Sequence, residues 1–426
     1  MTDRGGRRKL LDDCFLHDTD RMRHADVMAL LRKRLACVAS VKIVPLAVAH
    51  RRISARDVVA NRPVPMHENS AVDGYAFNHA DYAENAGKLS LGGRLAAGDT
   101  EARDLKQGEC VRIFTGAVMP DGADTVAMQE DCRIEGEMIL IPEGLKAGAN
   151  CRHSGEDLAT GETVVPAGQI IRAQDIAALA SMGLAEIQVR SRLRVAVMST
   201  GNELVAPGGT IRHGQVFDSN AIMLRTLVES LGGLVTDIGI VEDRAERIES
   251  ALAEAAKSHD LVITSGGASR GEEDHMLAAL DRLGKRHLWQ IAIKPGRPMM
   301  FGQIGDCVVL SLPGNPVAAF VCFLLYVRTA MDALAGADHR DPVRYPLPAA
   351  FDIPKKKRDR REFLRGHLVP KTADGALTVA KYPQDGSGLI SGLRAADGLI
   401  ELGEEVTSVR RGDMVDFIPF AEFGVV

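Results

Sequence analysis

The sequence predicts an α/β and β multidomain protein with a central parallel-sheet α/β domain. Three observations support this prediction. The chain has 426 residues, more than a single hydrophobic core usually organises. Short apolar runs alternate with helical patterns over residues 191–340, as they do in parallel sheets covered by helices. The segments on either side are rich in glycine, proline and short strand-like pieces, which favours β domains.

The elements of the central domain follow one another in a regular order. The apolar run LRVAVMST, residues 193–200, predicts a buried strand. A helix is expected next, capped within Asp218 to Asn220 and ended by the Gly232-Gly233 pair. Further strands are expected at LVTDIGIV, DLVITS, LWQIAIK and CVVLSL, with helices between them and a last helix from Asn315 to Leu334. Ligands of such sheets bind beyond the carboxyl ends of the strands.

The flanking segments predict further domains. Residues 61–155 are β-rich. Residues 21–60 look helical and then extended, and residues 156–190 end in a helix and a strand, so these two stretches are expected to pack together around the inserted β-rich domain. From residue 341 onward, alternating apolar residues and turns predict a small C-terminal β-barrel. Residues 1–20 are predicted to be a mobile tail.

Composition excludes several classes of protein. Lys plus Arg is 52 and Asp plus Glu is 57, a net charge of −5, which argues against nucleic-acid binding because phosphate backbones require a basic face. The seven cysteines contain no C-x-x-C pair, as expected in the reducing cytoplasm. The longest apolar run, Pro316 to Val327, is shorter than the roughly 20 residues of a membrane span, so no membrane association is expected.

The loop TSGGASRGEED, Thr264 to Asp274, combines glycines and hydroxyls with acids. The backbone of Gly266 and Gly267 can approach an anion closely at the start of a helix, and Ser265 and Ser269 can donate further hydrogen bonds. Asp274 follows one turn later, and a carboxylate beside bound phosphates is the usual setting for Mg²⁺. The loop therefore suits an anion that arrives with a cation. A plain strand-to-helix turn with an acidic first turn explains the same residues.

Two more loops follow predicted strands. Lys294 and Arg297 flank a Pro-Gly turn in IAIKPGRPMMFG, and arginine can bind an oxyanion through two hydrogen bonds. In SLPGNPVAAF, Pro313 and Pro316 stiffen a loop at a helix start, and Asn315 is a candidate cap. A solvated basic hairpin and ordinary turn chemistry are the alternatives.

The remaining motifs are weaker taken singly. Glu203 follows a strand in STGNEL, and Thr115 precedes two turns in IFTGAVMPDGADTVAMQE. Asp73 lies in ENSAVDGYAF, where Ser70 and Asp73 also match a helix capping box. The basic run from Lys355 to Arg361 is interpreted as a solvated face.

Two features close to that run are better candidates for anion binding. Arg365, on an expected strand, is the better anion ligand than the basic run, and DGSG, Asp385 to Gly388, is a second candidate anion loop. The histidines show no metal-binding spacing.

The order of the motifs along the chain is more specific than any single motif. SAVDGYA, FTGAVMPDGADTV, GEDL, STGNEL, SGGASRGEED, IKPGRP, LPGNPV and FLRG together resemble the molybdopterin molybdenumtransferase family, of the MoeA and gephyrin E-domain type. The resemblance extends from about Arg21 to the C-terminus. It implies an elongated subunit with a helical and extended dimerisation domain (21–60 plus 156–190), a β-rich domain (61–155), an α/β molybdopterin-binding domain (191–340) and a β-barrel domain (341–426).

The resemblance also implies an activity. Members of the family are homodimers, with a cleft between the α/β domain of one subunit and the β-rich domain of the other. They take adenylylated molybdopterin and molybdate, use Mg²⁺, release AMP and form molybdenum cofactor. A molybdopterin adenylyltransferase and apo-molybdoenzymes are the protein partners that this activity implies.

Individual residues receive roles from the same resemblance. The expected catalytic residues are Glu203, Asp274, Lys294 and Asp73. The expected Mg²⁺ ligands are Asp243 and Asp274, and Asp157 matches another acid of the family. The expected substrate-binding residues are Thr115, Ser265, Gly266, Gly267, Ser269, Arg297, Pro313, Pro316, Arg365 and Ser387.

Three positions depart from the family pattern, and two other functions stay open. The family usually has Asp at Asn202, Lys at Gln290 and Met at Val72. The chain could instead be a molybdopterin adenylyltransferase, whose α/β fold and glycine loop are similar. It could also be a divergent paralogue that carries the cofactor without inserting metal, a hypothesis that Asn202 and Gln290 keep open.

Overall fold

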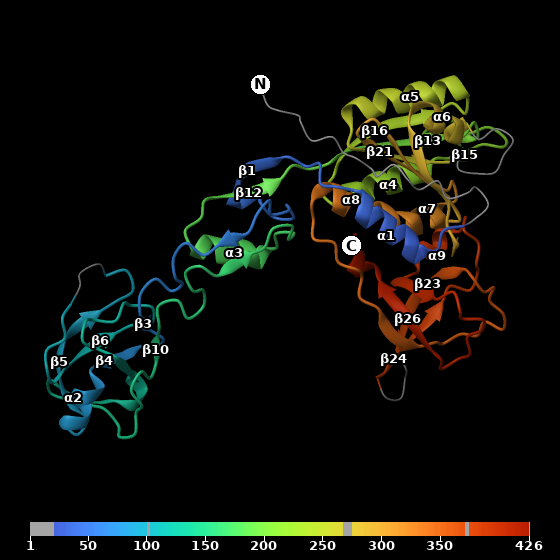
Figure 1. The fold of residues 1–426 in the computed structure, drawn as a ribbon. Helices are drawn as coiled ribbons and strands as arrows, with labels where there is room; N and C mark the ends of the chain where they lie inside the picture. The colour runs from blue at the N-terminus through green and yellow to red at the C-terminus, as the bar shows by residue number, and fades with distance from the viewer. Residues whose placement is uncertain (1–20, 100–102, 267–274, 371–374, 426) are drawn as a thin grey trace, which may run out of the picture.

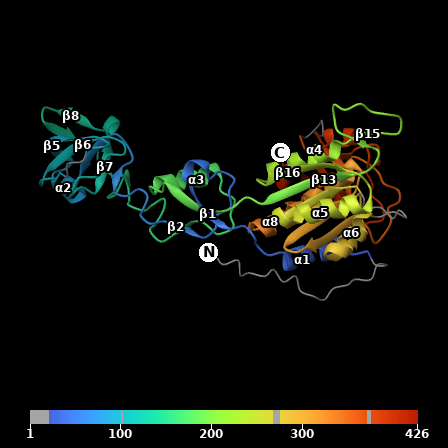
Figure 2. The ribbon, with the colours of Figure 1, turned by 90° about the horizontal axis from the view of Figure 1, so that it is seen from above.

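The computed structural model describes residues 21–99, 103–266, 275–370 and 375–425. Figure 1 shows an elongated molecule, with the central α/β part and the C-terminal sheet together at one end and the β-rich part at the other. A thin middle part joins the two ends, and the view in Figure 2 shows the same separation. The tail predicted for residues 1–20 lies outside the described residues.

The central part contains a mixed six-stranded sheet with the order β16-β13-β17-β21-β20-β18. β16, β13, β17 and β21 run parallel, as predicted. β20 and β18 are antiparallel to their neighbours, so the prediction of a parallel sheet is wrong at this edge. The cause is the short Gly305-Asp306 turn between β20 and β21, because a two-residue turn can join only antiparallel strands. The strands are β13 Arg194–Thr200, β16 Leu234–Val241, β17 Leu261–Ser265, β18 Lys285–Gln290, β20 Pro298–Ile304 and β21 Cys307–Leu312, and a short pair, β14 Leu204–Val205 with β15 Val216–Phe217, follows β13.

Helices cover both faces of this sheet. Ala196 and Met198 of β13 pack in one apolar cluster with α5 and α6, whereas Val195 and Val197 pack in a second cluster with α4, α7 and α8. Successive side chains of a strand point to opposite faces, so the sheet is the middle layer of the core. The helices are α4 Ser219–Ser230, α5 Ala245–Ser258, α6 His275–Leu283, α7 Pro316–Cys322 and α8 Arg328–Ala335, with a π-helical turn, η3 Phe323–Val327, between the last two.

The two ends of α4 form as its sequence predicts. Asp218 occupies the N-cap position, and its side chain accepts a hydrogen bond of 3.0 Å from the backbone N–H of Ala221. Gly232 follows the helix with a φ of 79°, the left-handed conformation that favours glycine after a helix.

The helical stretch from Pro316 to Ala335 has 20 residues and a mean hydropathy of 1.7, values that a membrane-spanning helix also has. In the part of the chain that the structure describes, it is the one helix long and apolar enough for that role. However, 78% of its apolar window is buried inside the protein, as in the core helix that the sequence predicts.

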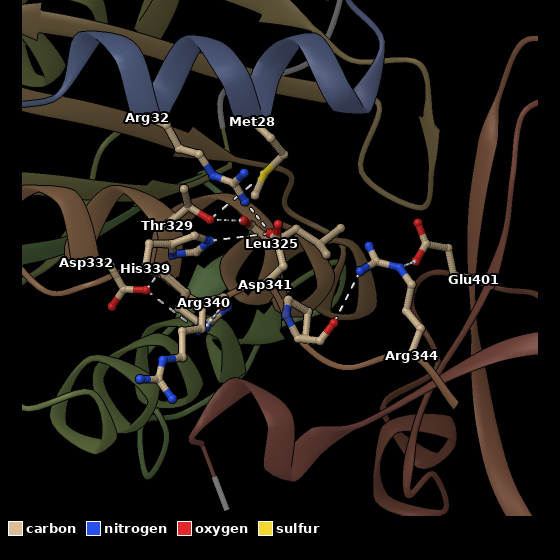
Figure 3. Close-up of polar contacts among 12 residues, drawn as sticks. Met28, Arg32, Leu325, Thr329, Asp332, His339, Arg340, Asp341, Arg344 and Glu401 are labelled. Carbon is tan, nitrogen blue, oxygen red and sulfur yellow. Dashed lines mark hydrogen bonds and ion pairs between the residues drawn. The ribbon is translucent and has the colours of Figure 1, made fainter. Parts of the chain in front are cut away.

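Helix α1, His24–Arg34, packs on the central part. Val27 and Leu31 are fully buried in the apolar cluster that also contains Met331 of α8. Figure 3 shows α1 lying across α8, with Met28 facing Thr329. The sequence grouped α1 with the extended residues that follow it, but its apolar face is covered by the central part instead.

The segment between α8 and the C-terminal sheet is held by polar contacts, which Figure 3 shows. His339 Nδ1 lies 2.8 Å from Asp332 Oδ2 of α8. Asp341 pairs with Arg32 of α1, and Arg344 Nε donates to Glu401 Oε2 at 2.7 Å. These contacts fix the C-terminal sheet against the central part.

Two distant stretches of chain form the middle part. β1 Val41–Pro45 pairs with β12 Glu186–Arg190, and β2 Val58–Val59 pairs with β11 Thr163–Val165. Helix α3 Ala173–Ser181 and the 3-10 turn η1 Leu46–Val48 complete it, and one apolar cluster joins both stretches.

The β-rich part is inserted between those two stretches. Its main sheet has the order β7-β4-β6-β5-β9-β8. The elements are β3 Asn69–Ser70, β4 Gly74–Phe77, α2 His79–Glu84, β5 Lys88–Leu95, β6 Glu109–Ile113, β7 Thr125–Met128, η2 Gln129–Asp131, β8 Arg133–Glu135, β9 Met138–Leu140 and β10 Cys151–Arg152, which pairs with β3.

The C-terminal sheet has the order β19-β23-β25-β26-β22, with β24 paired to β23. A bridge between Ala349 and Val379 links the end of β22 to β24, which closes the ring of strands. β19 belongs in sequence to the central part and pairs in parallel with β23. The elements are β19 Ile293–Lys294, β22 Tyr345–Pro348, β23 Arg361–Pro370, β24 Leu377–Lys381, α9 Ile390–Arg394, β25 Gly398–Leu402, β26 Met414–Pro419 and η4 Phe420–Phe423.

His24 of α1 is 6% exposed, and its Nδ1 lies 2.9 Å from the Tyr326 hydroxyl. Burial, followed by the nearby Arg361 and Arg344, lowers the pKa of His24 to about 4 from 6.5. Between these pH values the unfolded chain binds a proton that the folded chain excludes. The free energy of unfolding should therefore fall as pH falls through this window, by up to about 3 kcal/mol.

Urea unfolding between pH 7 and pH 4.5 measures this effect. A His24→Asn variant should be less stable at pH 7 and should lose less stability on acidification than the wild type. Exposed His67 supplies the control, His67→Asn, which should follow the wild-type curve. An equal acid sensitivity in His24→Asn and wild type would contradict the prediction.

Candidate active site

A cavity of about 470 Å³ lies between the central part and the C-terminal sheet. Its walls come from the segment around β19, the loop after β21, and the C-terminal segments 357–365 and 382–387. Five residues that were expected to act in catalysis or substrate binding line it: Lys294, Arg297, Pro313, Arg365 and Ser387. Pro316 begins helix α7 beside this cavity. Residues from four separate segments of the chain are thus brought to one place.

The lining of this active-site cavity is strongly cationic. It contains seven basic residues, namely Arg21, Lys294, Arg297, Lys357, Arg358, Arg360 and Arg365, against two acids, Asp359 and Asp385. Several positive charges around one cavity favour an anionic ligand, and low-dielectric walls strengthen the attraction.

Lys294 is placed by the pairing of β19 with β23. In that register Lys294 lies opposite Glu362, and its Nζ lies 3.7 Å from Glu362 Oε2 and 3.7 Å from Asp385 Oδ2. Glu362 is 5% exposed, so a buried carboxylate and a loop carboxylate together hold the ammonium group at the wall of the cavity.

Arg297 is oriented by Gln290, one of the positions that depart from the family pattern. Arg297 Nε and Nη2 lie 3.3 Å and 3.2 Å from Gln290 Oε1, to which both donate. An amide oxygen holds the guanidinium without cancelling its charge, whereas a lysine at this position would repel it. The departure removes one cation but positions another.

Arg365 lines the cavity and also holds a loop of its wall in place. Its Nη1 donates to the carbonyls of Gly386 and Leu389 at 3.0 and 3.3 Å, and its Nη2 donates to that of Gln384. The guanidinium also stacks 5.1 Å from the centre of the Tyr382 ring, and burial lowers the pKa of Arg365. Arg365 was expected to neutralise an anion directly, but most of its donors shape the loop that carries Ser387.

The carboxyl ends of the parallel strands approach one another beside this cavity. Gly266, with a φ of 91°, packs so closely that a Cβ there would lie 2.3 Å from the Thr200 carbonyl oxygen. Asn220 Nδ2 donates to Ser265 Oγ at 2.8 Å and to the Gly314 carbonyl at 2.7 Å. Gly314 lies between Pro313 and Asn315 of the cavity wall, so the strand ends and the cavity are contiguous.

Glu203 and Asp243 belong to the same edge of the sheet. The Glu203 carboxylate folds back on Gly201, where any Cβ would lie 2.6 Å from Oε2. Asn202 Oδ1 accepts a hydrogen bond of 3.2 Å from the Asp243 N–H. Asn202, a second departure from the family pattern, therefore keeps the acceptor that joins the two loops.

The other predicted residues of the glycine loop, Gly267, Ser269 and Asp274, lie outside the described residues. The described ranges contain no group of three or more His, Cys, Asp or Glu side chains that could hold a metal ion. Mg²⁺ is usually bound by one or two carboxylates together with substrate phosphates and waters. Glu203 and Asp243 are carboxylates on adjacent loops, so this donor set fits a magnesium ion that arrives with a phosphate ligand.

Asp73 and Thr115 lie together, but in the β-rich part. Asp73 Oδ1 accepts hydrogen bonds from the Thr115 N–H at 2.8 Å and from Thr115 Oγ1 at 2.7 Å, and these bonds lower the pKa of Asp73. Both views place this part far from the active-site cavity of the same chain. The capping-box alternative is wrong, because Ser70 lies on β3 and a strand follows Asp73.

Asp157 and Asn315 lie in two different parts of the molecule. Asp157 is exposed in the connection between β10 and β11, and its N–H donates to the Val64 carbonyl at 3.1 Å. Asn315 occupies the N-cap position of α7, but its side chain makes no capping hydrogen bond, so the predicted cap is wrong. Asn315 instead lies on the wall of the active-site cavity.

The basic run was interpreted as a solvated face. Lys357 and Arg358 are exposed, as predicted, but the interpretation is wrong for Lys356. Lys357, Arg358 and Arg360 line the active-site cavity. Lys356 is 5% exposed and its Nζ donates to the carbonyls of Lys357, Arg360 and Gly403. The run is a structured loop that turns inward on Lys356. The dense positive charge next to a predicted strand could have indicated that this run belongs to the site. Arg21 and Tyr382 also line the cavity, but no pattern in the sequence indicates them.

The chain matches three family models along most of its length. Residues 22–183 match the MoeA N-terminal region (domain I and II), residues 196–333 match a probable molybdopterin binding domain, and residues 346–420 match the MoeA C-terminal region (domain IV).

Similar proteins carry one activity in their names. The molybdopterin molybdenumtransferase of Haemophilus influenzae is 36% identical over 377 residues, 88% of this chain and 93% of that protein. Molybdopterin molybdenumtransferase 2 of Mycobacterium tuberculosis is 33% identical over 384 residues, 87% of this chain and 92% of that protein. A crystal structure of a molybdopterin biosynthesis MoeA protein from Pyrococcus horikoshii superposes with a TM-score of 0.81 at 27% identity, and covers 94% of this chain and 100% of that chain.

The positioning role of Arg365 predicts the behaviour of Arg365→Lys. Lysine keeps the charge but cannot reach three carbonyls as a planar fork does. The 384–389 loop should open more readily, by about 1–3 kcal/mol, and its amides should exchange hydrogen faster by mass spectrometry. Arg358→Lys, at an exposed position on the same cavity, should leave that exchange unchanged. Unaltered exchange in Arg365→Lys would refute the positioning role.

Proposed function

The chain belongs to the MoeA family of molybdopterin molybdenumtransferases, enzymes of molybdenum cofactor biosynthesis, and from this premise we propose the reaction and the role of each part of its site. The substrates are adenylylated molybdopterin and molybdate. The phosphoanhydride of the adenylylated pterin is cleaved, AMP leaves, and molybdenum enters the dithiolene. The observation that carries the proposal is the cationic cavity contiguous with the carboxyl ends of the parallel strands.

The cavity supplies electrostatic stabilisation. Molybdate and phosphates are oxyanions, and Lys294 and Arg297 offer charged donors that are already held in place by Gln290, Glu362 and Asp385. Donors fixed before the reaction stabilise the charge that develops on a departing phosphate without reorganising. The chemistry is positioning plus charge compensation, with little covalent participation by the protein.

The strand ends supply the remaining groups. Ser265 and Gly266 offer a hydroxyl and a close backbone approach for phosphate, and Gly267 and Ser269 extend the same loop in sequence. Glu203 and Asp243, with Asp274, would hold Mg²⁺. When bound, this ion would compensate part of the phosphate charge. Without the ion, the carboxylates of Glu203 and Asp243 would repel a phosphate, so they favour a phosphate that binds together with a cation.

The β-rich part takes part in the reaction through a second copy of the chain. Asp73 and Thr115 form a rigid hydrogen-bonded pair that lies far from the cavity of their own chain. A homodimer brings this pair to the cavity of the other copy, and Asp157 lies near that contact. We place this dimer in the cytoplasm, where a molybdopterin adenylyltransferase supplies the substrate and apo-molybdoenzymes receive the product.

Two departures from the family pattern are compatible with turnover. Asn202 keeps the acceptor for the Asp243 N–H, and Gln290 orients Arg297. These contacts favour an active transferase over a carrier that lacks metal insertion.

Molybdate-dependent release of AMP from adenylylated molybdopterin, in the presence of Mg²⁺, tests the reaction. Lys294→Gln should lower kcat/KM by roughly 100- to 1,000-fold, because a charged donor aimed at developing charge is lost. Lys257→Gln, at an exposed position on α5, should keep the wild-type rate. Transfer of AMP from ATP to molybdopterin would instead identify an adenylyltransferase, and tight cofactor binding without turnover would identify a carrier; either result contradicts the proposal.

Mixed dimers test the shared site. Asp73→Asn and Lys294→Gln chains, each inactive alone, should regain about a quarter of the wild-type activity when coexpressed, because random pairing gives half of the dimers one intact site. Purification through two different affinity tags isolates the mixed dimer. If the mixed dimer is as inactive as its parents, both residues act within one chain or the β-rich part is dispensable.

A further inference from the structure

A second cavity lies where the middle part, the central part and the C-terminal sheet meet. It has a volume of about 370 Å³ and shares no lining residue with the active-site cavity. Its walls come from residues 51–53, 169–172 and 190–193, from residues 231–233 and 328–340, and from residues 421–424. We call it the junction cavity.

The junction cavity lies at the opposite edge of the central sheet from the active site. Leu193 and Gly233 line it and stand directly before the first residues of β13 and β16. The active site lies beyond the carboxyl ends of the same strands. A strand of seven residues spans roughly 20 Å, so one small ligand cannot occupy both places.

Arginines dominate the junction cavity. Seven line it, namely Arg51, Arg52, Arg172, Arg190, Arg192, Arg328 and Arg340, against three acids, Asp332, Asp338 and Glu422. Glu422 is also engaged by the Tyr345 hydroxyl and the Val343 N–H, and Asp332 by His339. Positive charge therefore exceeds negative charge on the cavity wall.

Several of these guanidinium groups are held by neutral carbonyls. Arg51 Nη2 donates to the carbonyls of Ser230 and Gly424, and Arg52 Nη2 donates to that of Arg190 at 2.8 Å. A carbonyl fixes the direction of a guanidinium but leaves its charge uncompensated. Arg172 forms an ion pair with Asp175, and Arg328 and Arg340 lie 3.9 Å from Asp332 and Asp338, so the uncompensated charge belongs to Arg51, Arg52, Arg190 and Arg192.

Two observations show that the charge is unsatisfied. Burial lowers the pKa of Arg52, and the charge of neighbouring Arg192 lowers it further. Arg190 Nε is buried and has no hydrogen-bond partner within the described residues. An anion between these side chains would relieve the repulsion and supply acceptors.

The floor of the junction cavity is apolar. Leu193, Met331 and Phe423 are at most 3% exposed and line it together with Ile53 and Leu231. Guanidinium groups match phosphate oxygens with paired hydrogen bonds, and an apolar floor suits a ring or chain. The volume lies in the range of small-molecule sites, about 300–1,000 Å³.

We propose that the junction cavity binds a small organic phosphate, at a site separate from the active site. The ligand would contact all three parts of the molecule at once and join them. This inference rests on the cavity alone and does not depend on the proposed reaction.

Hydrogen exchange by mass spectrometry on the full chain tests it, with AMP and inorganic pyrophosphate as separate probes. AMP should slow exchange in segments 51–54, 190–194 and 421–425. The double variant Arg52→Gln/Arg192→Gln should bind AMP at this site about 10- to 100-fold more weakly, because charge-assisted hydrogen bonds are lost. Lys294→Gln should retain the protection, which separates this site from the active site. Arg133→Gln, an exposed arginine on β8, is the charge-matched control and should also retain it.

The inference is overturned if AMP leaves these segments unprotected, if the double variant is protected as well as wild type, or if Lys294→Gln abolishes the protection. Protection by pyrophosphate without protection by AMP would overturn the assignment to an organic phosphate. A single Arg192→Gln variant, at an exposed position, gives the same comparison in a chain whose folding is unperturbed, as its unfolding temperature without ligand verifies.

Discussion

Mutual repulsion among cations is the constraint on which the active site depends. Seven basic side chains surround one cavity, and they stay there only because the fold holds each one in place. Lys294 is held by a buried carboxylate and a loop carboxylate, Arg297 by an amide oxygen, and Arg365 by backbone carbonyls. These partners fix positions while leaving a net positive charge, which is the property an oxyanion site requires.

The contacts between the central part and the C-terminal sheet hold the two walls of this cavity together. β19 leaves the central part and pairs with β23 of the C-terminal sheet, so the two walls of the cavity are joined by a parallel ladder. The segment through Asp341 and Arg344 ties the C-terminal sheet to α1 and to itself. The cavity therefore lies at a rigid boundary, whereas the β-rich part extends far from it.

Much of the central part could be predicted from the sequence because its signals are local. Buried strands, the Asp218 cap and the glycine after α4 depend on neighbouring residues alone. The antiparallel edge was missed because no strand was predicted at Pro298–Ile304, where the structure has β20. The position of α1 was missed because its apolar face shows that it packs, but not on which part. Lys357 and Arg358 are exposed, as predicted, but their place on the cavity wall was missed because it depends on strand pairing between residues distant in the sequence. Arg365 was recognised, but its partners lie in a loop that local patterns do not connect to it.

We propose that molybdate binds in the cation-rich cavity between the central part and the C-terminal sheet. Anomalous diffraction at the molybdenum edge, from crystals of the full chain soaked in molybdate, locates the metal directly. A peak inside this cavity, within hydrogen-bonding reach of Lys294 or Arg297 and absent from a Lys294→Gln/Arg297→Gln variant, is the expected result. Ordered molybdate elsewhere in the molecule, with none in this cavity, would contradict the claim.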